Sequence, residues 1–286
     1  MVEQLKGRKP SKAVADDFTG RFREIISDPL NLLIDRQPES GVVDSDGFVL
    51  LHNGNRVSIE GEFSYYGDFS RILELNRGVH EPLEEYVFQQ VLERLGERPR
   101  MLELGAYWAH YSMWLKRKQP MADVTLVEPE AFNLAVGQHN FEINGYRGEF
   151  LQKKVGRGHF SVDEFLDERQ MERLDILHSD IQGFELEMLE GCSKSLARRA
   201  IDYLFISTHS QKLHTSVTQL VEAAGYRLEI SSDYDSETTS YDGLIFASSM
   251  DIPSVFANFR PLGRVEIANA SPRELLCWLK ENALQA

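Results

Sequence analysis

The sequence predicts a doubly wound α/β fold, with helices on both faces of a seven-stranded sheet whose last two strands pair antiparallel. The first observation is that short apolar strands alternate with helical stretches after residue 80, which is typical of parallel strands joined by crossover helices. The second is that the last two strands follow each other with no helix between them, so we expect them to pair antiparallel. Five parallel strands and this pair make up the sheet.

The first part of the chain is expected to form a small α+β cap. Apolar residues at positions 25–34 indicate a helical stretch with one apolar side. A β-hairpin is predicted next, because residues 48–51 and 57–59 flank Asn53-Gly54, a dipeptide that fits a turn requiring positive φ. The predicted division is a cap over residues 1–80, a main domain over 81–250 and a C-terminal extension over 251–286.

The main domain is expected to begin with a helix, after which strands and helices alternate. Pro82 suits a first helical turn, apolar residues recur at helical spacing as far as Leu95, and Gly96 is a stop signal. Strands are predicted at 101–104, 124–127, 150–155, 174–177, 204–206, 226–230 and 244–247, and the intervening helices at 108–118, 131–144, 184–196 and 212–224. Ser271-Pro-Arg-Glu274 is a capping box that predicts a C-terminal helix.

Composition excludes several classes of protein. The 286 residues carry 31 basic and 45 acidic side chains, and 31 − 45 gives a net charge of −14. Nucleic acids and anionic lipids are bound through Lys and Arg, so neither is expected as a partner. We find no apolar run long enough to span a membrane, no secretion-signal core within residues 1–15 and only two cysteines. We therefore expect a soluble cytoplasmic protein.

The ends of the first two core strands suggest a nucleoside site. Gly105 follows the first strand and permits a sharp turn with close approach of a ligand, and Glu103 lies beneath that turn. Glu128 ends the second strand, 25 residues after Glu103, near the offset of about twenty for an acid that binds ribose hydroxyls. A carboxylate there repels a 2′-phosphate. The alternative is a glycine that only makes a turn and an acid that is only solvated.

A family resemblance follows from these motifs. Glu103-Leu-Gly-Ala106 with Tyr111-Ser112, Glu128-Pro129 with Asn140 and Asn144, and Asp180-Ile-Gln-Gly-Phe-Glu185 occur in the order found in FkbM-type methyltransferases. The resemblance covers roughly residues 80–248. It implies a class I, Rossmann-like methyltransferase fold and S-adenosylmethionine as cofactor. It places Glu103, Gly105, Ala106, Tyr107 and Glu128 around that cofactor.

The loop after the first strand departs from the family pattern. The usual Gly-Ala-Asn-x-Gly reads Gly105-Ala-Tyr-Trp-Ala109 here, so Tyr107 replaces a small amide and Ala109 replaces a glycine. Alanine is tolerated at the third glycine position of dinucleotide loops. We therefore expect binding to survive, with an altered arrangement around Tyr107.

Three residues at the ends of later strands are the candidates for catalysis. A hydroxyl acceptor needs a base or a metal ion to lose its proton. His178 and Asp180 end one predicted strand and His209 follows the next, so they are expected to converge as ligands of a divalent metal ion, or as a histidine base oriented by Asp180. The alternatives are hydrogen-bonded structural histidines and an Asp180 that caps a helix.

Other polar residues are weaker candidates. His214, Asp233, Asp235 and Asp242 are expected to border the acceptor pocket or to be solvated, and Tyr65, Tyr66 and Asp68 to cover the cofactor or to pack against the core.

The predicted function is O-methylation of a hydroxyl group on a sugar, glycan or secondary metabolite. Residues 161–190 hold ten acids and two bases, so the acceptor is not expected to be a polyanion, and a divalent cation has room at this edge. The alternatives are an NAD-dependent oxidoreductase, disfavoured because Gly-x-Gly is absent after the first strand, and a non-catalytic binding subunit. The oligomeric state is left open, with a homodimer among the options.

Overall fold

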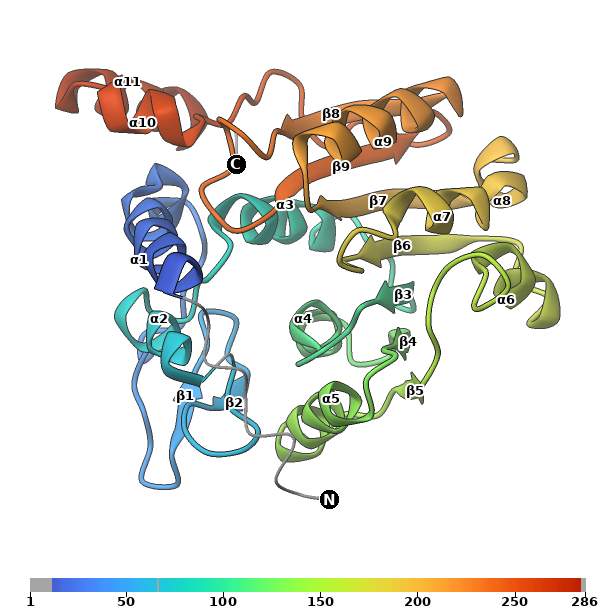
Figure 1. Cartoon of the computed structure of the whole chain (residues 1–286), viewed down its shortest axis with the longest axis horizontal. Coiled ribbons are helices and arrows are strands. Elements are labelled where there is room, and N and C mark those ends of the chain that lie inside the picture. The colour runs from blue at the N-terminus through green and yellow to red at the C-terminus, as the bar shows by residue number, and fades with distance from the viewer. Residues whose placement is uncertain (1–11, 66, 284–286) are drawn as a thin grey trace.

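A seven-stranded mixed sheet is the centre of the computed structural model, which describes residues 12–65 and 67–283 (Figure 1). Its strand order is β5-β4-β3-β6-β7-β9-β8. The strands are β3 (Arg100–Leu104), β4 (Asp123–Val127), β5 (Glu149–Leu151), β6 (Leu174–Ser179), β7 (Ile201–Thr208), β8 (Tyr226–Ser232) and β9 (Gly243–Ser249). β3 to β7 are parallel, and β9 runs antiparallel to both β7 and β8. The predicted sheet is confirmed.

Helices cover both faces of the sheet (Figure 1). Those on one face are α3 (Pro82–Leu92), α4 (His110–Lys118) and α5 (Ala131–Ile143); those on the other are α6 (Val162–Glu168), α7 (Glu185–Glu190), α8 (Ser193–Ala197) and α9 (Gln211–Ala223). Strand residues alternate between two apolar cores, so Met101 and Phe205 join the first and Leu102 and Leu204 join the second. This alternation is the two-residue period of a sheet buried on both sides.

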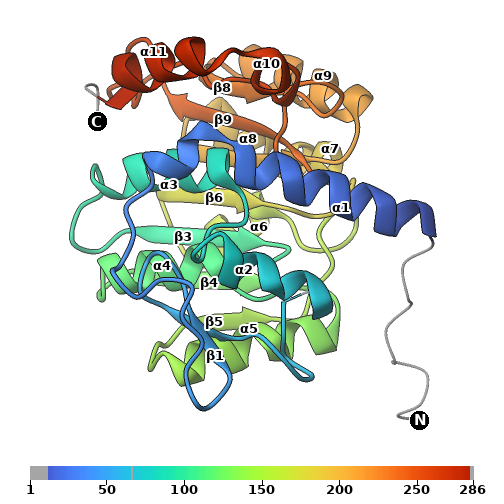
Figure 2. The same ribbon diagram turned by 90° about the vertical axis from the view of Figure 1, so that its left-hand side faces the viewer.

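The N-terminal segment adds to the first of these cores. It consists of α1 (Lys12–Ser27), the 3₁₀ helices η1 (Pro29–Leu32) and η2 (Gly67–Ser70), strands β1 (Phe48–Leu50) and β2 (Arg56–Ser58), and α2 (Arg71–Leu75). Figure 2 shows α1 crossing in front of the helices on this face. Ile25 and Val49 are fully buried in the same apolar cluster as Phe205 of the sheet. The division at residues 80 and 250 stays a prediction.

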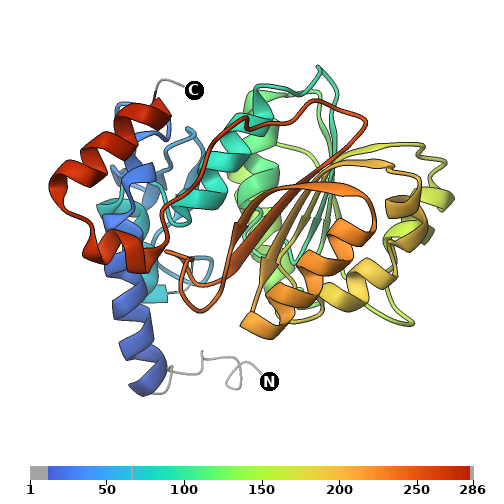
Figure 3. The same cartoon turned by 90° about the horizontal axis from the view of Figure 1, so that it is seen from above.

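The C-terminal helices return to the N-terminal side. Figure 3 shows α10 (Arg264–Asn269) and α11 (Pro272–Ala283) next to α1 and beyond the edge of the sheet. Both Arg21 and Arg264 donate to the carbonyl oxygen of Thr238, at 3.3 and 3.0 Å. The predicted capping box is present, because the Ser271 N–H donates to Glu274 at 2.7 Å and the Glu274 N–H donates to Ser271 at 3.3 Å.

Several predicted elements differ in detail. The strand predicted at 150–155 ends at Leu151, and the helical stretch predicted at 25–34 is the end of α1 followed by η1. The hairpin closes through the loop 51–55, in which Gly54 has φ +88°, rather than through a two-residue turn. The helix predicted at 184–196 is two helices, α7 and α8. The helix is interrupted between Glu190 and Ser193. The carboxylate of Asp163 accepts hydrogen bonds from the N–H groups of Lys194 and Ser195, at 2.9 and 2.8 Å, and so caps the start of α8.

Within the described residues, we find no helix with the length and apolar character needed to cross a bilayer. The expectation that residues 1–15 lack a secretion signal falls mostly on residues 1–11, which lie outside the described part of the chain.

Candidate active site

A cavity of about 810 Å³ lies at the carboxyl ends of the parallel strands. The loops after β3, β4, β6 and β7 and the loop before β9 contribute to its wall. Six acidic residues line it, Glu81, Glu103, Glu128, Glu130, Asp180 and Asp242, against Lys154 and the imidazoles of His80, His110, His178 and His209. A cavity with this excess of negative charge favours a cationic or neutral ligand.

The loop after β3 is held in a conformation with three positive φ angles. Gly105 has φ +77°, and a Cβ there would lie 1.7 Å from the carbonyl oxygen of Asp180. The glycine is therefore required by the neighbouring β6 loop, whereas the sequence suggested a ligand as the reason. Tyr107 and Ala109 have φ +36° and +65°. These are the positions where the family has Asn and Gly, the residue types that tolerate left-handed backbone.

Asn140 supports this loop from outside the cavity. Its side-chain amide donates to the carbonyl oxygen of Trp108 at 3.0 Å from α5. Asn144, one helical turn further on, instead pairs with the backbone of Arg56 in β2, accepting at 2.9 Å and donating at 2.7 Å. One asparagine of the family motif thus holds the Gly105–Ala109 loop, and the other docks the hairpin.

Glu103 and Glu128, the two glutamates predicted to contact the cofactor, both line the cavity. Glu128 accepts from the N–H groups of Tyr107 and Glu130, at 3.3 and 3.1 Å. Glu103 accepts from the N–H of Ser112 at 3.1 Å, at the start of α4. Burial raises the pKa of both carboxyl groups. Both are more than nine-tenths buried, so each offers a desolvated carboxylate to a ligand.

His178 does not join Asp180 and His209, and the predicted metal triad of these three residues is wrong in that member. Its Nε2 lies 2.7 Å from Glu84 Oε1 of α3, and its ring lies against Tyr111, with 4.2 Å between the ring centroids. Burial by itself lowers the pKa of His178, but the hydrogen bond to Glu84 together with the charges of Glu84, Glu103 and Asp180 outweighs burial and raises it. His178 lines the cavity wall as half of a buried ion pair.

His209 lies among three carboxylates at the opposite wall. Its Nδ1 is 2.9 Å from Glu185, and its Nε2 is 3.0 Å from Asp180 and 3.3 Å from Asp242. Although burial favours the neutral ring, the hydrogen bonds to Asp180 and Glu185 raise the pKa of His209 to about 11. At neutral pH this imidazole is therefore a cation that cannot accept a further proton.

Asp242 takes the place that was predicted for His178. Burial, followed by repulsion from Asp180, raises the pKa of Asp242 well above its ordinary value. Asp180, His209 and Asp242 each offer one ligand atom, and these atoms lie within 4.8 Å of one another. Two carboxylates and one imidazole are a donor set that suits a divalent ion, so these residues fit the predicted metal better than the original three.

Of the remaining candidate residues, some line the cavity and others do not. Tyr65 lines the cavity, whereas Tyr66 and the side chain of Asp68 lie outside the described residues. His214 does not line it; its ring nitrogens lie within 2.9 Å of the hydroxyl groups of Thr208 and Ser231. Asp233 accepts from the N–H groups of its own loop and is structural.

Glu185 is the site residue that sequence reasoning missed. It is fully buried, and it is the last residue of the Asp180–Glu185 motif that resembles the family. From sequence, no catalytic or binding role was predicted for it. That motif is the signal that could have identified it, since the turn between the two acids brings both carboxylates to His209.

No curated protein matches the chain significantly. Among solved structures, it is similar to a precorrin-6y C5,15-methyltransferase from Geobacter metallireducens, at 15% identity over 58% of this chain and 88% of that one, with a TM-score of 0.42. It is also similar to TrmK of M. capricolum in complex with S-adenosyl-homocysteine, at 14% identity over 68% and 81%, with a TM-score of 0.41.

The family assignment rests on a separate match. The family model for the methyltransferase FkbM domain matches residues 52–228, more than half of the 286 residues. The matched segment runs from the hairpin loop to β8 and includes the Gly105 loop, Glu128 and the Asp180–Glu185 motif. With this match and the strand order described above, the class I methyltransferase-like fold is confirmed, and the chain belongs to the FkbM methyltransferase family.

Proposed function

We propose that this protein is an S-adenosylmethionine-dependent O-methyltransferase that acts on a hydroxyl group of a neutral sugar, glycan or secondary metabolite. The observation that carries the proposal is that the buried Glu128 carboxylate and the Asp180–His209–Asp242 group line one cavity. A cofactor bound at Glu128 and a proton acceptor in this group would then share one cavity, as methyl transfer to an alcohol requires.

The residues of the cofactor side fit a nucleoside that carries a positive charge. Glu128 would accept hydrogen bonds from ribose hydroxyls, and Glu103 from an ammonium group directly or through water. The excess of carboxylates in the cavity favours a sulfonium over an anionic nucleotide. When bound, S-adenosylmethionine supplies an electrophilic methyl group.

Deprotonation of the acceptor is assigned to a carboxylate, in place of the histidine considered from sequence. His209 already carries a proton at neutral pH. Asp242 is the stronger candidate, because its carboxyl group lines the cavity beside His209, 3.3 Å from Nε2. His209 then balances the charge of the surrounding carboxylates and orients Asp180 and Asp242. A divalent cation that displaced the proton of His209 would be held by the same three residues and would lower the pKa of a bound hydroxyl.

The cofactor half is tested by titration calorimetry with S-adenosylhomocysteine. Glu128→Gln removes a buried, charged acceptor, so we expect affinity to fall about ten- to hundredfold. Glu142→Gln, an exposed acid on α5, is the matched control and keeps wild-type affinity. A wild-type protein that binds NADH in preference to S-adenosylhomocysteine would support the oxidoreductase alternative and contradict the proposal.

The acceptor half is tested by transfer of a labelled methyl group to a panel of neutral saccharides and polyhydroxylated metabolites. Asp242→Asn should lower kcat about 10²- to 10⁴-fold with unchanged affinity for S-adenosylhomocysteine, whereas Asp235→Asn, exposed in the same loop, should not. Methylation at nitrogen or carbon would refute O-methylation. Cofactor binding with no transfer to any acceptor would support the binding-subunit alternative.

A further inference from the structure

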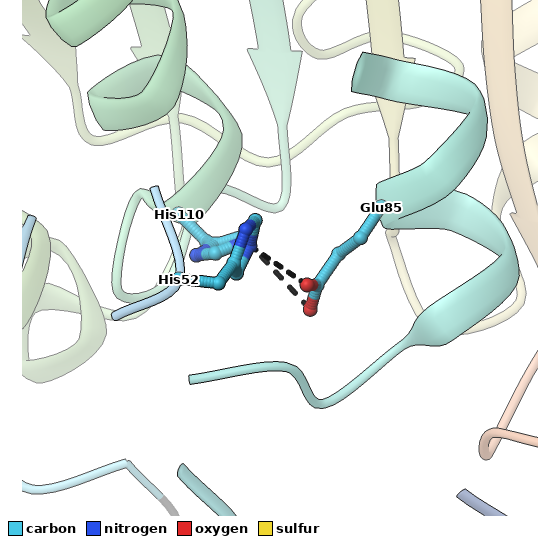
Figure 4. Close-up of side chains that lie close together, drawn as sticks. All are labelled: His52, Glu85 and His110. Atoms are coloured by element: carbon cyan, nitrogen blue, oxygen red, sulfur yellow. Dashed lines mark ion pairs between the residues drawn. The ribbon is translucent and has the colours of Figure 1, made fainter. Parts of the chain in front are cut away.

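A second cluster of titratable side chains lies beside the cavity and has no role in the proposed reaction. It consists of His52 in the hairpin loop, Glu85 in the first turn of α3 and His110 at the start of α4 (Figure 4). All three are buried, with exposed fractions of 1%, 0% and 2%. Figure 4 shows both imidazole rings turned toward the Glu85 carboxylate. Three segments that are distant in sequence therefore converge on one point.

The donor atoms of this cluster are close to metal-binding geometry. His52 Nε2 is 2.8 Å from Glu85 Oε2, and His110 Nε2 is 3.8 Å from Glu85 Oε1. One ligand atom from each residue lies within 4.8 Å of the others. Bond lengths of about 2.0–2.2 Å around a tetrahedral Zn²⁺ place donors about 3.4 Å apart, which lies between the separations of 2.8 and 3.8 Å found here.

Unpartnered polar atoms point independently to a ligand. Neither Nδ1 nor Nε2 of His110 has a hydrogen-bond partner, and neither does Nδ1 of His52. The His110 ring is instead packed between aromatic rings, with Trp108 stacked at 4.8 Å between centroids. A buried polar atom without a partner is rare in native proteins and destabilises them. A metal ion on Nε2 of His110 would satisfy an atom that the protein leaves unpaired.

The surroundings of Glu85 hold its carboxylate in place for this purpose. Oε1 accepts from the N–H groups of His80 and Glu81, at 2.9 and 3.1 Å, and lies 2.5 Å from Nδ1 of His80. These contacts fix one oxygen and leave Oε2 facing His52. A ligating carboxylate whose second oxygen is hydrogen-bonded in this way is the usual outer-shell arrangement of metal sites.

We propose that His52, Glu85 and His110 form a binding site for a divalent transition metal ion, with Zn²⁺ as the ion of choice. Two imidazoles and one carboxylate suit Zn²⁺ better than Mg²⁺ or Ca²⁺, which take mostly oxygen ligands. The ion joins the hairpin loop to α3 and α4, and His110 itself lines the cavity. It would therefore fasten the N-terminal segment to the wall of the active-site cavity. This site is separate from the Asp180–His209–Asp242 group and does not depend on the proposed reaction.

The test measures Zn²⁺ binding by the full-length protein after treatment with a chelator. We expect one tightly bound equivalent of Zn²⁺ that is retained in His209→Gln, and a rise in Tm of about 5 °C when free Zn²⁺ is 100-fold above Kd. His110→Gln should weaken binding at least 100-fold. His159→Gln, which removes an exposed histidine, should leave it unchanged, and so should His209→Gln, which disrupts the other candidate metal group.

A second variant and a second readout guard against misfolding. His52→Gln removes a ligand on a different segment and should also abolish tight binding. Co²⁺ gives a visible absorption spectrum that reports its ligands, and this spectrum should be present in wild type and lost in both variants. Wild-type protein that takes up no Zn²⁺, or binding that persists in both His52→Gln and His110→Gln, would overturn the proposal.

Discussion

The protonation state of His209 gives the sharpest prediction, because three carboxylates surround one imidazole. Glu185 contacts its Nδ1 at 2.9 Å and is fully buried. Glu185→Gln keeps the shape of the side chain and an oxygen that accepts from the Gly183 N–H, at present a 3.1 Å bond. The substitution therefore removes one negative charge with little change in packing. We expect the pKa of His209 to fall from about 11 toward its ordinary value.

The magnitude follows from Coulomb's law. Two unit charges about 4 Å apart interact by about 4 kcal/mol at an effective dielectric constant of about 20. One pKa unit corresponds to about 1.36 kcal/mol, so losing the Glu185 charge should lower the pKa of His209 by about 3 units. Asp180 and Asp242 remain, so the expected pKa in the variant is still above the ordinary value of 6.5 for histidine.

The assay is NMR titration of the histidine ring signals between pH 5 and 10. In wild type the His209 signals should not move below pH 9, and in Glu185→Gln they should titrate within the range. Glu187→Gln, exposed on the same helix, should behave as wild type. A wild-type His209 that titrates near pH 6.5 would refute the reasoning and restore histidine as the candidate base.

The raised pKa of His209 also predicts how the free energy of unfolding changes with pH. The folded pKa of His209 lies above the unfolded value, so its contribution to stability is complete below pH 6.5 and is lost as pH rises toward 11. The free energy of unfolding of wild type should therefore fall between pH 7 and 10 more steeply than that of His209→Gln. Equal slopes would contradict the charge assignment.

Three further predictions concern stability and are measured by thermal or urea unfolding. Gly105→Ala places a Cβ 1.7 Å from a backbone oxygen and should cost several kcal/mol or prevent folding, whereas Gly96→Ala, with no atom within 4 Å, should be nearly neutral; equal effects would refute the close approach. Burial raises the pKa of Asp28 to about 6, so its ionised form destabilises the fold above that pH. Relative to wild type, Asp28→Asn should gain about 3 kcal/mol between pH 4 and pH 7.5, and a pH-independent difference would count against it. Asp163 is on α6, and its carboxylate caps α8. Asp163→Ala should therefore lower the free energy of unfolding by about 2 kcal/mol. Asp167→Ala, at an exposed position of α6, should change it by less than about 0.5 kcal/mol.

Much of the fold could be predicted because the signals are local. The signals are apolar runs, helical spacing and residues that start or stop a helix, such as Pro82. Each depends only on neighbours in the chain, and together they predicted the strands and most of the helices. The place of Gly105 and Glu128 in the cavity wall could be predicted for a related reason, since parallel strands bring their carboxyl ends to one edge of the sheet. Gly105 and Glu128 follow adjacent strands β3 and β4, so their position in the chain was enough to bring them to one cavity.

Sequence by itself therefore determined the order of the elements, the family and the edge of the sheet where chemistry is expected. The partner of each titratable side chain was decided only by tertiary packing. His178 pairs with Glu84, 94 residues away, because α3 packs over β6. His52, Glu85 and His110 meet because the hairpin loop packs against α3 and α4. These contacts join residues that are far apart in the sequence. They depend on how the helices pack, which side-chain shape and burial decide, and no spacing along the chain encodes them.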